Sequence, residues 1–148
     1  MLRNALFALS IAAIGGAVSA QNCATLAVTG NGAPGTTLSF SIDGSAANAF
    51  AFLVVGQAQG TLAVDLGPIG SLTLGVLPDF ILPLGMTDLA GDVTLAAEVP
   101  NMPSIPGQDL FGQGVTLGFT LPTLPPTGIP NFAWTLCASN VLGFHFGA

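Results

Sequence analysis

Short apolar runs separated by turns rich in glycine and proline make up most of the chain after residue 20. In Thr37–Ile42 and Val93–Val99 every second residue is apolar, which predicts strands with one buried and one exposed face. Ala49–Val55 is apolar throughout, which predicts a strand covered on both faces. The positions expected to point inward in the two alternating runs are Leu38, Phe40, Ile42, Val93, Leu95 and Ala97.

The turn residues recur at roughly ten-residue spacing, which is typical of a two-sheet sandwich. They leave no window long enough for an amphipathic helix. We therefore expect residues 21–148 to form one all-β domain, a two-sheet antiparallel β-sandwich of about eight or nine short strands, with a closed barrel as the alternative. Pro83 places the run Phe80–Leu84 at a sheet edge or outside a ladder. The other expected runs are Ala24–Thr29, Thr61–Leu66, Ser71–Leu74, Leu110–Gln113, Val115–Thr120, Phe132–Ala138 and Val141–Phe146.

Residues 1–20 have the pattern of a secretory signal peptide. Arg3 supplies a positive start, Ala5–Ala17 is an uncharged and mostly apolar core, and Val18-Ser19-Ala20 offers small residues for cleavage before Gln21. An uncleaved anchor is the competing interpretation, but an anchor needs about 20 apolar residues. We expect a secreted or cell-surface protein, with the periplasm as a further location.

Arg3 is the one basic residue of the chain, so the expected mature protein has no lysine or arginine. All seven acidic residues lie after residue 20. Nucleic acids and anionic membrane surfaces are bound mainly through lysine and arginine. We therefore expect neither as a partner.

The two cysteines, Cys23 and Cys137, stand near the two ends of the expected domain. An even count in an exported protein favours a disulfide between them. Two buried free thiols are the alternative.

The chain offers few groups for catalysis. His145 is the only histidine, and its alternation with Phe144 and Phe146 predicts that it points outward without a chemical role. A Ser-His-Asp arrangement would need a nucleophile, and the Gly-x-Ser-x-Gly motif is absent. One histidine and two distant cysteines do not supply a zinc site. We expect no enzyme activity and no cofactor.

The acidic residues leave two weak alternatives open. Asp79, Asp88 and Asp92 are candidate calcium ligands because calcium prefers oxygen, but their spacing matches no known loop and solvated turns explain them equally well. A hydrolase that uses a carboxylate pair is the other alternative, although seven carboxylates make some pair inevitable.

Sugar-binding sites stack their ligands on exposed tryptophan or tyrosine. This chain has no tyrosine, and its one tryptophan, Trp134, is expected in the core near the disulfide because it stands three residues before Cys137. The phenylalanines after residue 20 are likewise expected in the core. Ala49–Val55 is β-prone and uncharged, so edge-to-edge assembly into a layer or fibre is a further hypothesis.

Several short motifs resemble a family of small exported bacterial β-sandwich domains of unknown function, which often form the C-terminal domain of larger secreted proteins. The chain departs from the family pattern where Val141 follows Asn140 in place of glycine and where Gln108-Asp109 interrupts the middle motif. The resemblance implies a β-sandwich and no catalytic or binding residue. The matching stretches are Gly32–Thr36, Phe52–Gly56, Leu66–Gly70, Val99-Pro100-Asn101 with Phe111-Gly112-Gln113, and Ala138-Ser139-Asn140.

Together these features predict a secreted, non-catalytic structural or interaction module at the cell exterior. Self-association and a place in a cell-surface matrix are the two roles that we consider for it. The alternative is a binding module for polysaccharide or another uncharged surface.

Overall fold

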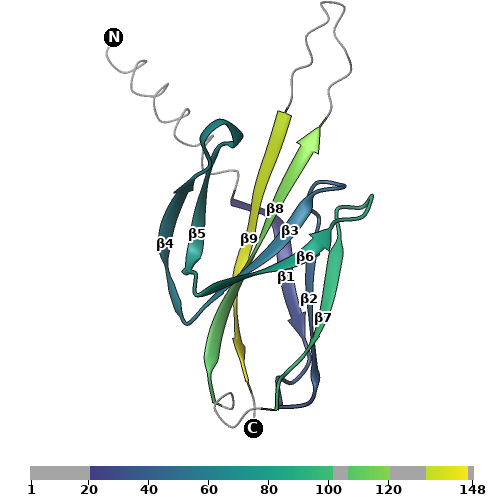
Figure 1. Cartoon of the computed structure of the whole chain (residues 1–148), viewed down its shortest axis with the longest axis vertical. Coiled ribbons are helices and arrows are strands. Elements are labelled where there is room, and N and C mark those ends of the chain that lie inside the picture. The colour runs from purple at the N-terminus through teal and green to yellow at the C-terminus, as the bar shows by residue number, and fades with distance from the viewer. Residues whose placement is uncertain (1–20, 102–106, 121–132, 147–148) are drawn as a thin grey trace, which may run out of the picture.

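The computed structural model describes residues 21–101, 107–120 and 133–146, and these form nine strands and one short 3₁₀ turn (Figure 1). The predicted all-β class is confirmed. The predicted signal peptide and Phe132 lie outside the described residues. The elements are β1 (Gln21–Thr29), β2 (Thr37–Asp43), β3 (Phe50–Gly56), β4 (Ala58–Asp65), η1 (Gly67–Ile69), β5 (Ser71–Leu77), β6 (Phe80–Met86), β7 (Val93–Glu98), β8 (Asp109–Thr120) and β9 (Ala133–His145).

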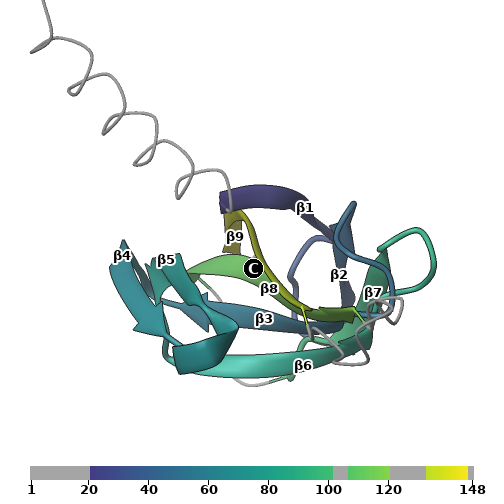
Figure 2. The same cartoon turned by 90° about the horizontal axis from the view of Figure 1, so that it is seen from above.

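Seven strands form one large sheet in the order β6-β3-β8-β9-β1-β2-β7, and β4 and β5 form a second, two-stranded sheet. The large sheet is mixed, because β1 runs parallel to β9 while the other pairs are antiparallel. Strand β1 also changes partner: Gln21 and Ala24 align with β9, and Thr25–Thr29 pair with β2. The sheet folds over at β1, so that β2 and β7 face the layer of β6, β3, β8 and β9 (Figure 2).

The main core fills the space between these two layers. Leu38, Phe40 and Ile42 of β2 are buried in it, as their alternation predicts. The inward positions of β7 are partly buried against the same cluster, which confirms that prediction too. The other buried members are Ala24, Leu26, Ala51, Leu53, Val55, Leu84, Val99, Leu110 and Cys137.

The β4–β5 hairpin covers part of the outer face of the large sheet and makes a second, smaller core. Its buried members are Leu72 and Leu74 of β5, Val54 of β3 and Ala138 of β9. Strand β3 is therefore covered on both sides only in its second half. The expectation that all of Ala49–Val55 is covered is wrong at Phe50, which is 53% exposed because the hairpin does not reach it.

Two expected pairs of strands are single long strands. Leu110–Gln113 and Val115–Thr120 belong to β8, and the runs on either side of Ser139-Asn140 belong to β9. The register between them shifts at Gly114, whose N–H bonds to the Ser139 side chain instead of a facing carbonyl. A bulge thus takes the place of the expected turns.

The predicted disulfide between Cys23 and Cys137 is confirmed, with Cα atoms 5.7 Å apart. It joins β1 to β9 beside the parallel pairing. Pro83 lies in β6, an edge strand, as predicted. The described ranges include no helix of the length and apolarity needed to cross a membrane.

Candidate functional site

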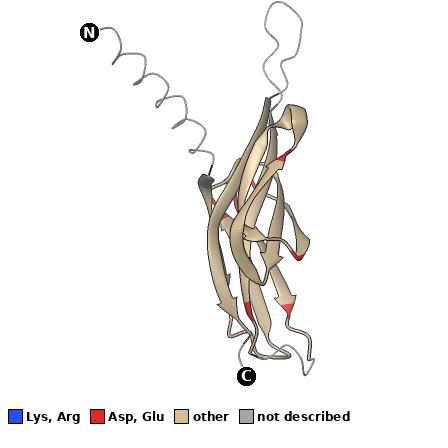
Figure 3. Cartoon of the chain, turned by 90° about the vertical axis from the view of Figure 1, so that its left-hand side faces the viewer, with Lys and Arg blue, Asp and Glu red and all other residues tan. Residues whose placement is uncertain are grey.

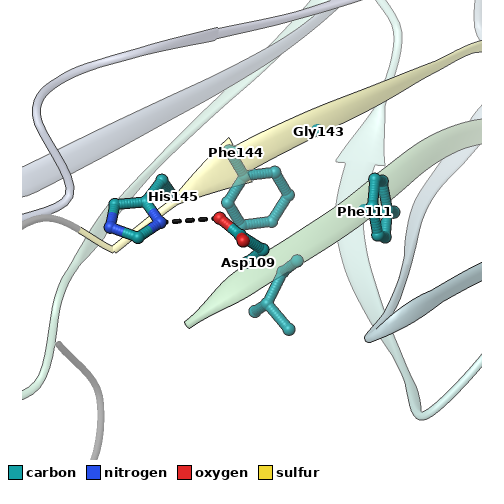
Figure 4. Close-up of a pocket in the computed structure, with 6 residues that line it drawn as sticks. Asp109, Phe111, Gly143, Phe144 and His145 are labelled. Carbon is teal, nitrogen blue, oxygen red and sulfur yellow. Dashed lines mark hydrogen bonds and ion pairs between the residues drawn. The ribbon is translucent and has the colours of Figure 1, made fainter. Parts of the chain in front are cut away.

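His145 and Asp109 face each other across the end of the β8–β9 hairpin (Figure 4). The His145 Nδ1 atom lies 2.6 Å from the Asp109 Oδ1 atom, and both side chains are exposed. The outward orientation predicted for His145 is confirmed, and its contact with Asp109 is a feature that the alternation does not predict. Among the described residues the hollow beside the pair is lined further by Leu110, Phe111, Gly143 and Phe144, none of which has a hydroxyl or thiol side chain.

The three calcium candidates do not converge on one point. Asp88 and Asp92 lie in the turn after β6, while Asp79 precedes β6 and its Oδ2 atom accepts the N–H of Gln57 at 2.9 Å. A seven-residue strand separates its ends by about 20 Å. In residues 21–101, 107–120 and 133–146 no group of three or more histidine, cysteine or acidic side chains is placed to hold a metal ion.

Asp88 organises the turn itself. Its Oδ1 atom accepts the backbone N–H groups of Asp92 at 3.0 Å and Ala90 at 2.8 Å. These two hydrogen bonds, with that of Asp92 the stronger influence, lower the pKa of the Asp88 carboxyl below its ordinary value. Asp92 in turn accepts the N–H of Gly44 and so ties the β6–β7 turn to the β2–β3 turn. Asp88 and Asp92 therefore hold the two turns together.

A row of apolar side chains crosses the outer face of the large sheet beside the β4–β5 hairpin. Its last member, Leu136, is partly buried against the core under the hairpin. The register aligns Met86 of β6 with Phe50 of β3, Phe50 with Leu117 of β8, and Leu117 with Leu136 of β9. Phe50 and Met86 are each 53% exposed. Four neighbouring strands therefore present one continuous apolar row.

An aromatic pair extends this row along β8 and β9. Phe119 and Trp134 face each other in the register, with ring centroids 4.9 Å apart, and are 41% and 43% exposed. We call the whole surface the open face. It consists of Phe50, Met86, Leu117, Phe119, Trp134 and Leu136.

The expectation that Trp134 packs in the core near the disulfide is wrong. Successive side chains of a strand point to opposite faces, so two residues three apart lie on opposite sides. Cys137 is buried between the layers, and Trp134 accordingly emerges on the outer face. The three-residue spacing between Trp134 and Cys137 in one strand could have predicted this exposure from the sequence. The expectation that the phenylalanines all belong to the core also fails, because Phe50, Phe80 and Phe119 are exposed.

The open face carries no ionisable group. The acidic residues lie scattered over the molecule, mostly in turns and at strand ends, and none belongs to the row or to the aromatic pair (Figure 3). No lysine or arginine follows Arg3 in the sequence. The side chains of this face therefore offer apolar and aromatic contact surface and one hydrogen-bond donor, the indole N–H of Trp134.

Strand β3 and edge strand β6 are less suited to edge-to-edge assembly than the open face. The β-prone stretch Ala49–Val55 lies largely in β3, which pairs with β6 on one side and β8 on the other, so its backbone is already occupied. Edge strand β6 carries Pro83 and a register shift opposite Ala51 and Phe52. Both features hinder the addition of another strand.

Comparisons with known proteins identify no relative: no family model, curated protein or solved structure matches this chain.

Proposed function

We propose that this protein is an exported, non-catalytic interaction module that associates with a second copy of itself through the open face. The observation that carries the proposal is the uncharged apolar row across β6, β3, β8 and β9, continued by the aromatic pair. Contiguous exposed apolar patches of this kind mark interaction sites in soluble proteins. Aromatic side chains and methionine are also enriched in protein interfaces.

A second copy is the partner whose chemistry fits this surface. It presents the same uncharged apolar row, and two identical patches can meet around a twofold axis. No carboxylate lies within the row, so joining two such faces leaves no buried unpaired charge. Sugars, by contrast, need hydrogen-bonding side chains as well as stacking surfaces, and the open face supplies only the indole N–H of Trp134.

Support for export comes from the N-terminal segment and from the Cys23–Cys137 disulfide, which is compatible with an extracellular location. Support for a non-catalytic role comes from the described residues that line the hollow beside His145 and Asp109, none of which has a hydroxyl or thiol side chain, and from the separation of Asp79 from Asp88 and Asp92.

Sedimentation velocity of the exported protein, over roughly a hundredfold range of concentration, tests the proposal. We expect a reversible dimer for the unaltered chain and a monomer for Phe50→Ser. Leu89→Ser is the matched control, because Leu89 is 85% exposed but lies in the turn after β6, outside the open face. This control should dimerise like the unaltered chain. A protein that stays monomeric throughout, or equal loss in both variants, overturns the proposal.

The exposed Phe119–Trp134 pair favours one second candidate, an uncharged polysaccharide stacked on these rings. Co-sedimentation with insoluble cellulose and chitin tests it, with Trp134→Ala as the variant. Suppose that the protein is monomeric in solution and co-sediments with a polysaccharide, and that Trp134→Ala does not co-sediment. Polysaccharide binding would then replace self-association as the proposed function. No retention removes this candidate.

A further inference from the structure

A second apolar site lies between the two layers, at the end of the sandwich where β9 finishes. It is a cavity of about 360 Å³ whose walls come from both layers. Phe40 and Phe144 form one wall, with ring centroids 5.6 Å apart, and Phe146 continues it at 5.8 Å from Phe144. The remaining lining residues are Leu38, Val55, Phe80, Leu82, Ala97, Glu98, Val99, Pro100 and Leu110.

The topology explains why this cavity opens to solvent. Strands β6 and β7 are the two edges of the seven-stranded sheet, and no ladder joins them where the sheet folds over. The lining includes Phe80 and Leu82 from β6 and Ala97 and Glu98 from β7, so the unpaired edges bound the opening. Phe80 stands partly exposed at this opening. A ligand can therefore enter between two strands without breaking a backbone hydrogen bond of the sheet.

The size of the cavity suits a small organic group. An apolar protein cavity of about 150 Å³ stays dry and binds benzene, so this cavity has room for a group of about ten carbon atoms. Its volume also falls within the range of known ligand pockets, roughly 300–1,000 Å³. The site is separate from the open face, which lies on the outer side of the sheet.

The chemistry of the lining also indicates that an uncharged ligand is favoured over an anion. Apart from Glu98 the described side chains of the lining are hydrocarbon, and Glu98 occupies an exposed position of β7. A carboxylate ligand would find no cation here, because no lysine or arginine follows Arg3, and it would approach a protein whose charged groups are acidic. The alkyl or aryl group of an uncharged ligand has no charge to desolvate on entering, whereas an ionised ligand must give up the water around its charge without compensation.

We propose that this cavity binds the alkyl or aryl group of an uncharged small molecule, such as a medium-chain alcohol, and excludes the corresponding carboxylic acid anion. This site acts independently of self-association through the open face.

Displacement of a neutral fluorophore, N-phenyl-1-naphthylamine, tests the proposal, because its naphthyl group is of the size that the cavity admits while its phenyl group can remain at the opening. We expect saturable fluorescence enhancement with the exported protein at pH 7 and competition by octan-1-ol. Octanoate should compete at least about tenfold less effectively, because its charge has no partner in the site. No saturable enhancement, or equal competition by the two compounds, overturns the proposal.

Two neighbouring alanines of β7 give a matched pair of variants. Ala97 lines the cavity and Ala96 is exposed on the opposite face of the same strand. Ala97→Phe should fill the cavity and abolish the saturable fluorescence enhancement, while Ala96→Phe should leave the enhancement and its competition by octan-1-ol unchanged. Equal binding by both variants overturns the assignment of the site.

Methyl NMR of the unaltered protein locates the site even if Ala97→Phe does not fold. Addition of octan-1-ol should shift the methyl signals of Val55, Leu82 and Leu110, which line the cavity. The signals of Leu72 and Leu74, which belong to the separate core under the hairpin, should stay in place. Shifts confined to Leu72 and Leu74, or absent altogether, overturn the proposal.

Discussion

Gly91, in the turn between β6 and β7, shows how closely two loops of this protein approach each other. Its φ is +87°, and an added Cβ would overlap the carbonyl oxygen of Ser45 in the turn between β2 and β3. The same contact is held by two hydrogen bonds to the Gly91 carbonyl, one from the Ser45 N–H at 3.1 Å and one from its hydroxyl at 2.8 Å. These two turns therefore fit only if residue 91 has no side chain.

Gly91→Ala should lower the free energy of unfolding by about 2–4 kcal/mol, because it combines a strained φ with a backbone overlap. Gly44→Ala is the control: its φ is +78°, and an added Cβ would meet nothing within 4 Å. We expect about 1 kcal/mol for this control, from the strained φ alone. Urea unfolding of both variants measures the difference. Equal losses would show that the overlap is relieved by a small shift of the turn.

The disulfide links two residues 114 positions apart, so its removal frees a very long loop in the unfolded chain. Cys23→Ser combined with Cys137→Ser should cost about 3–5 kcal/mol of stability. Thermal unfolding of the unaltered protein, measured with the disulfide intact and after its reduction, checks the same effect without a mutation. A double variant as stable as the unaltered protein would contradict this prediction.

The turn after β6 should make stability depend on acid pH. The pKa of Asp88 is lowered in the folded protein by its hydrogen bonds to the N–H groups of Asp92 and Ala90. Its contribution is therefore present above the pKa of an unfolded aspartate, about 3.9, and is lost as the pH falls through the lower pKa of the folded state. Asp88→Asn should flatten the acid limb of the curve of unfolding free energy against pH. Parallel curves for the two proteins would contradict this.

At the scale of elements, the β4–β5 hairpin is attached to the large sheet through one buried amide as well as through its apolar contacts. The Gln113 side chain accepts the N–H of Gly75 in β5 at 2.8 Å and donates to the Ser139 carbonyl at 2.9 Å. The Gln113 side chain and its bond to Ser139 are buried, and its bond to Gly75 is partly buried. The amide thus fixes the position of β5 along β8.

Gln113→Leu should leave the Gly75 N–H and the Ser139 carbonyl unpaired, at a cost of about 2–4 kcal/mol. We expect hydrogen exchange to rise throughout β4 and β5 and to change little in β2 and β7. Gln59→Leu is the matched control because Gln59 is exposed on β4. The interpretation fails if exchange rises equally in all strands, since the loss would then be global.

The alternation of apolar and polar residues predicted which side chains of a strand face the core. The inward residues of β2 and β7 followed directly from their period of two, and Pro83 predicted an edge. The sequence could not show that β8 and β9 continue through their bulge, because Gly114 and Ser139-Asn140 have the composition of turns. Nor could it show that β1 changes partner. The exposure of Trp134 could have been predicted, because residues three apart on a strand lie on opposite faces and Cys137 is buried. The exposure of Phe50 could not, because it depends on where the β4–β5 hairpin ends.

At the scale of the whole molecule, charge opposes the proposed association while apolar contact favours it. The formal net charge is −6 with Arg3 included, and no cation balances the acidic residues after residue 20. Two copies that meet through the open face therefore repel each other through the carboxylates around it. The charged groups lie outside the face, so this repulsion acts across solvent and is open to screening.

Salt should consequently strengthen the dimer. Raising the ionic strength from about 0.01 M to about 0.15 M shortens the Debye length from roughly 30 Å to 8 Å, which removes most of the repulsion and leaves the apolar contact intact. Sedimentation velocity of the unaltered protein at the two salt concentrations should show a tighter dimer at the higher one, and Phe50→Ser should remain monomeric at both. An interface built on ion pairs would respond in the opposite direction. A dimer that weakens with salt would therefore place the contact somewhere other than the open face.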